Sequence, residues 1–260
     1  MKKYVRFCYN DEVLYGILTE QVIHKLAGNS LSTFASTDEV IPQEKVVLLP
    51  PCEPSKIIGT GLNYSDIQLS PGESLPEKPK LFIKPPSTLI TDGEEIVQPP
   101  MVKQLSCEVE LAIVIGKTAK CVPLEEATAY IWGYTVVNDV TASDLQKEDV
   151  LWARSKSFDT FLPVAPCIVS DIDFKNLSLT TTVNNKVVQQ GCTNDMIKDV
   201  PWLISYISHI MTLLPGDMII TGTPTGYGSR LHIGDVVKTE IRELGSVTNP
   251  VAEFQNPYYY

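Results

Sequence analysis

Short apolar segments, rather than long amphipathic repeats, set the pattern of this chain. Residues 109–115 are dense in Val, Ile and Leu, which is typical of a strand buried on both faces. Only residues 123–134 and 200–213 show the apolar spacing of a helix. The other apolar segments have strand character and are separated by glycine, proline and polar turns; the clearest are 4–7, 13–18, 80–84, 133–140, 164–169, 177–183 and 236–241.

This pattern predicts a mixed β fold with short α-helices, an α+β protein, in two parts. Residues 1–50 indicate a small β-rich N-terminal appendage whose last strand is stopped by Pro50 and Pro51. Residues 51–256 contain the longest apolar strand and all the candidate functional residues, so we expect them to form the functional domain.

Two carboxylates open the most apolar strand, and a third closes a neighbouring one. Glu108 and Glu110 are two residues apart, so in a strand their side chains lie on the same face. Like charges at the start of an apolar strand repel each other, and burial raises the free-energy cost of keeping both ionised. Asp139 lies at the end of segment 133–140. A cation that prefers hard oxygen ligands, such as Mg²⁺, Mn²⁺ or Ca²⁺, would resolve the conflict; a solvated strand end is the alternative interpretation.

Several polar segments follow apolar strands and supply further candidates. Residues 56–64 run from an apolar strand into glycines, the usual way in which a strand delivers a loop to a site. The polar segment 66–79 is expected to be a loop or a short lid. Arg154 and Lys156 are the nearby cations that could hold a substrate anion, with solvated surface charges as the alternative. Segment 218–226 ends in threonines and glycines, whose hydroxyls and amides suit a carboxylate.

Charge and cysteine content exclude several classes of function. The 260-residue chain has a net charge of -10 and a pI of about 4.8, which argues against binding to nucleic-acid backbones or anionic membranes. No apolar run approaches a membrane span, and the N-terminus lacks the apolar core of a signal peptide. Six scattered cysteines without a Cys-x-x-Cys pair are typical of reduced thiols, so we expect a cytoplasmic protein.

Taken in order, several motifs resemble the fumarylacetoacetate hydrolase family over residues 50–253. Within that family, the sequence is most similar to the bacterial branch that contains the homoprotocatechuate-pathway isomerase/decarboxylase. The motifs that carry the resemblance are Gly61-Leu62-Asn63-Tyr64, Glu108 to Lys117, Gly133-Tyr134-Thr135, Asn138-Asp139-Val140-Thr141, Lys156 to Thr160, Pro215-Gly216-Asp217 and Thr221 to Pro224.

The resemblance implies a β-roll core with short helices, a homodimer and a bound Mg²⁺ or Mn²⁺ ion. It assigns the metal to Glu108, Glu110 and Asp139, and it assigns a catalytic lysine near the metal to Lys156. It also implies that a small-molecule substrate contacts further polar side chains, namely Asn63, Tyr64, Gln146 and Thr223.

The sequence departs from the family pattern at two places. In many members the Asn-Tyr pair is followed by a His and, three residues later, a Glu, a dyad that activates water or moves protons. Here those places hold Ile67 and Ser70, and Ser143 stands where an arginine is usual. Asp66 or Glu73 is the candidate catalytic carboxylate that could replace the dyad, with solvated loop charges as the alternative.

These features favour a divalent-metal-dependent enzyme that acts on a small 2-oxo or 2-hydroxy-dienoic di-acid through a metal-stabilised enolate. Decarboxylation and keto–enol isomerisation rank above hydrolysis, because hydrolysis requires a base that can deprotonate water near neutral pH. Two alternatives stay open. One is a C–C bond hydrolase of the acylpyruvate or fumarylpyruvate type with a non-histidine base, and the other is a catalytically silent paralogue that binds metal or ligand.

Overall fold

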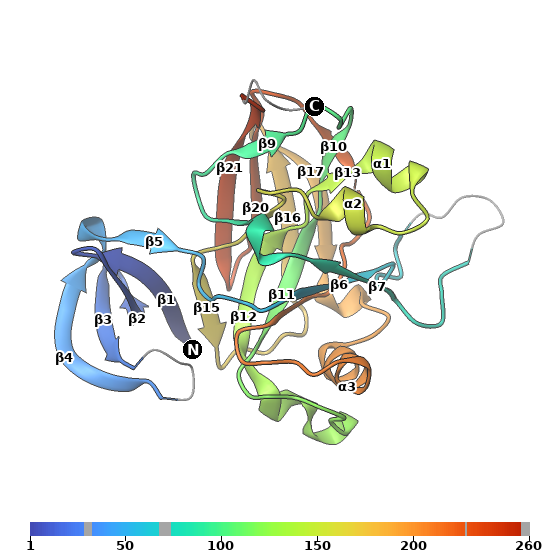
Figure 1. Cartoon of the computed structure of the whole chain (residues 1–260). Helices are drawn as coiled ribbons and strands as arrows, with labels where there is room; N and C mark the ends of the chain where they lie inside the picture. The colour runs from blue at the N-terminus through green and yellow to red at the C-terminus, as the bar shows by residue number, and fades with distance from the viewer. Residues whose placement is uncertain (29–32, 68–73, 227, 256–260) are drawn as a thin grey trace.

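Strands dominate the protein, and its helices are short (Figure 1). The computed structural model describes residues 1–28, 33–67, 74–226 and 228–255. The predicted mixed β architecture with short α-helices is therefore confirmed. Within these ranges the helices are η1 (Gln43–Lys45), η2 (Pro86–Thr88), η3 (Leu124–Tyr130), α1 (Ser143–Glu148), α2 (Ala153–Lys156), η4 (Thr193–Asp195) and α3 (Val200–Ile210), where η marks a 3-10 helix.

The largest sheet of the described chain has eleven strands and passes from the N-terminal part into the main body. Strand β1 pairs antiparallel with β15, so backbone hydrogen bonds join the two parts. Figure 1 shows the blue N-terminal strands beside the body of the protein. The strand order is β4 (Ala35–Pro42), β3 (Val22–Ala27), β2 (Glu12–Thr19), β1 (Lys2–Tyr9), β15 (Cys167–Ser170), β12 (Ile131–Asn138), β11 (Val109–Ile115), β18 (Met218–Ile220), β6 (Ile57–Gly61) and β7 (Lys80–Lys84), with β5 (Val47–Leu49) paired to β1.

Three smaller sheets complete the described β structure. The five-stranded one stacks on the central strands, since residues of both contribute to one apolar cluster that contains Ile113 and Leu179. The sheets are β17 (Lys186–Cys192), β16 (Ser178–Val183), β20 (Val236–Ile241), β21 (Gly245–Glu253) and β9 (Ile96–Gln98); β13 (Thr141–Ala142), β10 (Leu105–Cys107) and β19 (Ser229–Leu231); and β14 (Leu162–Pro163) with β8 (Leu89–Ile90).

Strand β11 is buried along its whole length, as its apolar sequence predicts. Leu111 and Ile113 face the cluster that includes helix α3, whereas Ala112 and Val114 face a second cluster on the opposite side of the sheet. A strand packed on both faces has little freedom to shift its register, because a shift would move every side chain to the wrong face. The residues at its N-terminal end are therefore held firmly.

Two predicted helices end earlier than their apolar spacing suggests. The 3-10 helix η3 stops at Tyr130, whose carbonyl accepts the N–H of Gly116 at 2.7 Å, and Ile131 then pairs with Ile115 in the central sheet. Helix α3 stops at Ile210, because Leu213 exchanges both backbone hydrogen bonds with Ala119 at 2.9 Å. In both places tertiary strand pairing outweighs the local helical pattern. Within the described residues, no helix combines the length and apolar character that a bilayer span requires.

Asp217 fixes the start of strand β18 against the segment that enters β6. Its buried carboxylate accepts the N–H and hydroxyl of Ser55 at 2.9 and 2.7 Å and the N–H of Leu214 at 2.8 Å, and it forms an ion pair with Lys56. These contacts join segments that lie far apart in the sequence.

We expect Asp217→Asn to lower the free energy of unfolding by about 2–4 kcal/mol, because the new amide group opposes several donors and the Lys56 ion pair is lost. Chemical denaturation measures the change. Asp38→Asn, at an exposed carboxylate, is the control and should stay within about 0.5 kcal/mol of the native protein. Equal stability of both variants would contradict this role of Asp217.

Candidate active site

The structure brings together the three carboxylates that the sequence singles out. Glu108 and Glu110 lie at the N-terminal end of β11, and Asp139 directly follows β12, the antiparallel neighbour of β11. Their ligand oxygens all lie within 4.8 Å of one another, and all three residues are buried. The Asp139 N–H donates to the Glu108 carbonyl at 2.8 Å, and the Glu108 N–H donates to the Asn138 side chain at 3.0 Å. Strand pairing thus sets the distance between these side chains.

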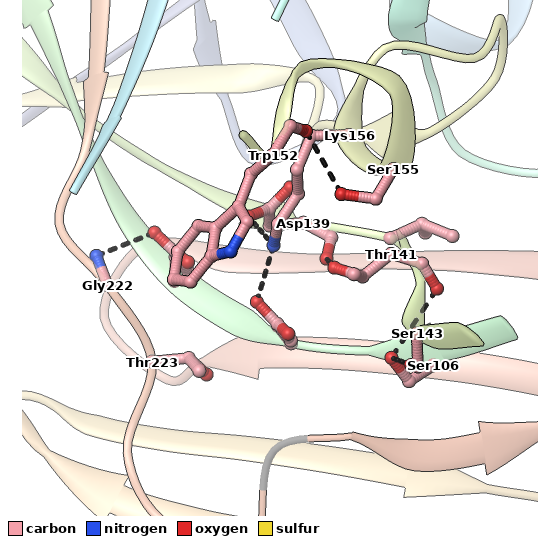
Figure 2. A network of polar contacts seen from close by, with 12 residues as sticks. Ser106, Asp139, Thr141, Ser143, Trp152, Ser155, Lys156, Gly222 and Thr223 are labelled. Carbon is pink, nitrogen blue, oxygen red and sulfur yellow. Dashed lines mark hydrogen bonds and ion pairs between the residues drawn. The ribbon is translucent and has the colours of Figure 1, made fainter. Parts of the chain in front are cut away.

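Two buried lysines partly compensate the three carboxylates. The Lys156 ammonium, from α2, donates to Glu108 Oε2 at 2.8 Å and to Asp139 Oδ2 at 2.5 Å (Figure 2). The Lys84 ammonium, at the end of β7, donates to Asp139 Oδ1 at 2.7 Å and to the Val140 carbonyl at 3.3 Å. Sequence reasoning missed Lys84. The only sequence signal is its place at the end of an apolar strand, and that does not reveal its burial beside Asp139.

The ion pairs fix the charge states of Lys156 and Asp139. Burial alone would lower the pKa of Lys156, but Asp139, Glu108 and Glu110 together raise it above its ordinary value. Burial alone would raise the pKa of Asp139, but Lys156 and Lys84 outweigh it and lower that pKa. Lys156 is therefore an ammonium group and Asp139 a carboxylate at neutral pH.

Glu110 is the least compensated member of the triad. Its Oε2 accepts the N–H of Gly222 at 2.7 Å, and neither lysine bonds to it directly. Burial, followed by the charge of Asp139, raises the pKa of Glu110 well above its ordinary value. Gly222 has a φ of +87°, and a Cβ there would lie 2.7 Å from the Thr60 carbonyl oxygen, so the turn requires glycine.

The donor set fits a divalent cation. Three buried carboxylates against two lysines leave one excess negative charge, and Glu110 lacks a cationic partner among the described residues. A cation with a preference for hard oxygen ligands would lower the electrostatic cost of burying Glu110. Glu108, Glu110 and Asp139 would hold it.

The triad forms one side of a cavity of about 250 Å³. Gln146 and Thr223, two of the predicted substrate contacts, line this cavity, and so does Ile67. No histidine lines it among the described residues. The other lining residues are Gly61, Leu62, Phe82, Lys147, Trp152, Lys156 and Gly222.

Thr223 is held in place by two neighbours. Its hydroxyl donates to the Val109 carbonyl at 2.8 Å and accepts a hydrogen bond from Gln189 Nε2 at 2.7 Å. A hydroxyl has one proton to donate, and here Val109 takes it. Thr223 therefore shapes the cavity wall (Figure 2) and, as the structure stands, offers a substrate carboxylate no hydroxyl donor.

Asn63 and Tyr64, also predicted to contact the substrate, lie outside the cavity lining. The Asn63 side chain accepts the N–H of Lys198 at 2.9 Å and donates to the carbonyls of Lys198 and Thr221 at 3.0 and 2.9 Å. Tyr64 is fully buried and forms a β-bridge with Met196. Both residues join the loop after β6 to other segments, and their contact with a substrate stays a prediction.

The remaining candidates either do not line the cavity or lie outside the described residues. Arg154 is half exposed, does not line the cavity and pairs with Asp149 at 2.6 Å and Glu148 at 3.1 Å, so local carboxylates already neutralise it. Asp66 accepts the N–H of Thr225 at 3.0 Å and does not line the cavity. Glu73 and Ser70 lie outside the described residues.

Fold and site together define a mixed β protein that buries an acidic triad with the ligand set of a divalent-metal site. The model of the fumarylacetoacetate (FAA) hydrolase C-terminal family matches residues 56–252, and an Rv2993c-like N-terminal model matches residues 2–51. The chain belongs to the fumarylacetoacetate hydrolase family, as its motifs indicate.

Three similar proteins illustrate the range of the relatives. An uncharacterized protein of Methanocaldococcus jannaschii is 48% identical over 201 residues, which cover 77% of this chain and 84% of that protein. The human mitochondrial oxaloacetate tautomerase FAHD2A is 39% identical over 224 residues, covering 82% of this chain and 71% of that protein. The crystal structure of 2-hydroxyhepta-2,4-diene-1,7-dioate isomerase from Mycobacterium marinum has a TM-score of 0.90 and 37% identity, covering 98% of this chain and 100% of that one.

Glu110→Gln provides the sharpest test of metal binding at the triad. We expect Mn²⁺ to raise the melting temperature of the native protein and to have at most a small effect on the variant, because one charged ligand is lost. Without metal the variant should be at least as stable as the native protein, since a poorly compensated buried charge is removed. An equal Mn²⁺-dependent shift in both proteins would place the metal elsewhere.

Asp139→Ala is expected to behave differently from Glu110→Gln. Lys84 and Lys156 both pair with Asp139, so its removal leaves two buried ammonium groups with too few partners. Breaking buried ion pairs in this way should lower the free energy of unfolding by about 3–5 kcal/mol even without metal. Denaturant titration of the metal-free protein measures it, and unchanged stability would show that Asp139 serves the metal alone.

Proposed function

We propose that this protein is a divalent-metal-dependent keto–enol isomerase of a small 2-oxo di-acid, with oxaloacetate as the first substrate to test. The observation that carries the proposal is the position of Lys156, whose ammonium group lies in the cavity beside Glu108 and Asp139. The relatives named oxaloacetate tautomerase and 2-hydroxyhepta-2,4-diene-1,7-dioate isomerase support the same class of reaction.

Lys156 moves the proton in this proposal. In the conversion of enol to ketone, the Lys156 ammonium donates a proton to C3 of the substrate, and the resulting neutral amine accepts the proton that leaves the enol oxygen. One proton is given and one is recovered, so the lysine returns to its starting state. Asp139 and Glu108 keep Lys156 protonated between turnovers and hold its ammonium in place.

Mg²⁺ or Mn²⁺ is the proposed metal, held by Glu108, Glu110 and Asp139. When bound, such an ion supplies a Lewis acid that polarises the 2-oxo group of the substrate. Phe82 and Trp152 contribute apolar side chains to the lining of the cavity.

The cavity gives less support to hydrolysis. Ile67 lines it with an apolar side chain, and no described lining residue is a histidine. Asp66, the described candidate for an alternative base, accepts the N–H of Thr225 with Oδ2, has no hydrogen-bond partner at Oδ1 among the described residues, and lies outside the lining. Proton transfer within a bound substrate requires only Lys156, whereas hydrolysis requires a second group that deprotonates water.

Two assays on oxaloacetate separate the possible reactions. Loss of the enol form is followed by ultraviolet absorbance, and release of pyruvate is followed with a coupled dehydrogenase, both in Mg²⁺ or Mn²⁺. We expect rapid enol loss without pyruvate above the level that free metal ions alone produce. Enzyme-dependent pyruvate release would indicate a decarboxylase instead. Cleavage of acylpyruvates would indicate a hydrolase, and inactivity on all of them would indicate a silent binding protein.

Lys156→Met retains the apolar stem and removes the ammonium group. We expect kcat for enol-to-keto conversion to fall by about 10²–10⁴, because the proton donor is lost. Mn²⁺ should still raise the melting temperature, since all three carboxylates are present. Glu110→Gln should lose both properties. A Lys156→Met variant with native kcat would rule out Lys156 as the proton carrier.

A further inference from the structure

One face of helix α1 borders two neighbouring cavities. Ser143, Gln146 and Lys147 are spaced i, i+3 and i+4, which places them on the same side of a helix. A second cavity of about 390 Å³ adjoins the first, since Glu108, Gln146 and Lys147 line both. Lys147 therefore stands where the two cavities meet.

The second cavity is lined mainly by neutral polar groups. Ser106 and Ser143 place their hydroxyl oxygens 2.5 Å apart (Figure 2), and Gln104 and Thr225 add an amide and a hydroxyl. Glu108 and Lys147 are the charged residues among its described lining. Glu108 is paired with Lys156, so its negative charge is partly offset. Lys147 is the cation among these lining residues and is therefore the positive charge that a substrate could contact here.

Among the described residues that line either cavity, Lys147 is the cation whose ammonium has no ionic or hydrogen-bond partner. Lys156 and Lys84 are paired with the triad, and Arg154 is paired with Glu148 and Asp149. Lys147 is exposed, and its helix holds the stem of the side chain at the cavity border. The anion-binding role that the sequence suggests for Arg154 therefore fits Lys147 better.

We propose that Lys147 binds the second carboxylate of a di-acid substrate. The inference rests on the proposed function, because it assumes that the first carboxylate and the 2-oxo group lie at the metal triad. Three carboxylates, two lysines and a divalent ion leave one positive charge there, which one carboxylate neutralises. The second carboxylate requires another cation, and Lys147 is the unpaired one among the described lining residues.

Binding of two unreactive ligands to the Mn²⁺-loaded protein tests this assignment without relying on turnover. Malate and 2-hydroxybutyrate share a carbon skeleton and a chelating 2-hydroxy acid, and only malate carries a second carboxylate. Calorimetry should show that the native protein binds malate more tightly by roughly 1.5- to fivefold, the range expected of one exposed ion pair. The preference should shrink as salt is added.

Lys147→Met should abolish the preference for malate and leave the affinity for 2-hydroxybutyrate unchanged. Lys147→Arg should retain most of the preference, because the charge is kept. Lys120→Met is the matched control, at an exposed lysine that lines neither cavity, and should bind both ligands like the native protein. In the enol assay, Lys147→Met should raise KM for oxaloacetate by a similar factor with little change in kcat.

An undiminished malate preference in Lys147→Met would overturn the proposal, and so would a preference that is lost in Arg154→Met instead. Equal binding of malate and 2-hydroxybutyrate by the native protein would also overturn it. A protein that shows the expected malate preference yet converts no oxaloacetate would refute the proposed reaction and still support the role of Lys147, so the two failures are distinguishable.

Discussion

Burial of three carboxylates within 4.8 Å of one another is the constraint on which the site depends. Such a cluster persists only if its charge is offset, and the fold supplies two lysines from different elements, Lys84 from β7 and Lys156 from α2. Strand pairing of β11 with β12 fixes the carboxylates, while the lysines leave one negative charge in excess. The same arrangement thus explains the stability of the folded site, its fit for a divalent ion and the position of the Lys156 ammonium beside it.

The central strand and the triad could be predicted from sequence because their signals are local. An unbroken apolar run identifies β11, and the spacing of Glu108 and Glu110 fixes their common face. Asp139 required one further step, the recognition that a second β-branched strand ends in a carboxylate. The helix expected over 123–134 was wrong in its last four residues, because Ile131 gains a strand partner in Ile115 that local spacing does not reveal.

The charge partners could not be predicted, because they come from distant parts of the chain. Lys84 and Asp139 are 55 residues apart, and nothing near Lys84 indicates that its ammonium is buried. Arg154 and Lys147 present the reverse case. The sequence makes Arg154 a candidate for holding a substrate anion and gives no signal for Lys147, whereas the structure shows that Arg154 is neutralised by its neighbours and that Lys147 borders the cavity. Which charges are available to a ligand depends on tertiary pairing rather than on residue type.

The pairing of β1 with β15 has a consequence for the edge of the central sheet. On its other side, β15 pairs with β12, the strand that leads into Asp139. The N-terminal strands therefore cover the edge of β15 that would otherwise have no partner strand. An uncovered edge is a template for pairing with other chains. The N-terminal part therefore acts as an edge cap for the central sheet. A chain shortened to the functional domain would expose β15 and would be prone to intermolecular β-sheet aggregation, even though every residue of the triad would remain in place.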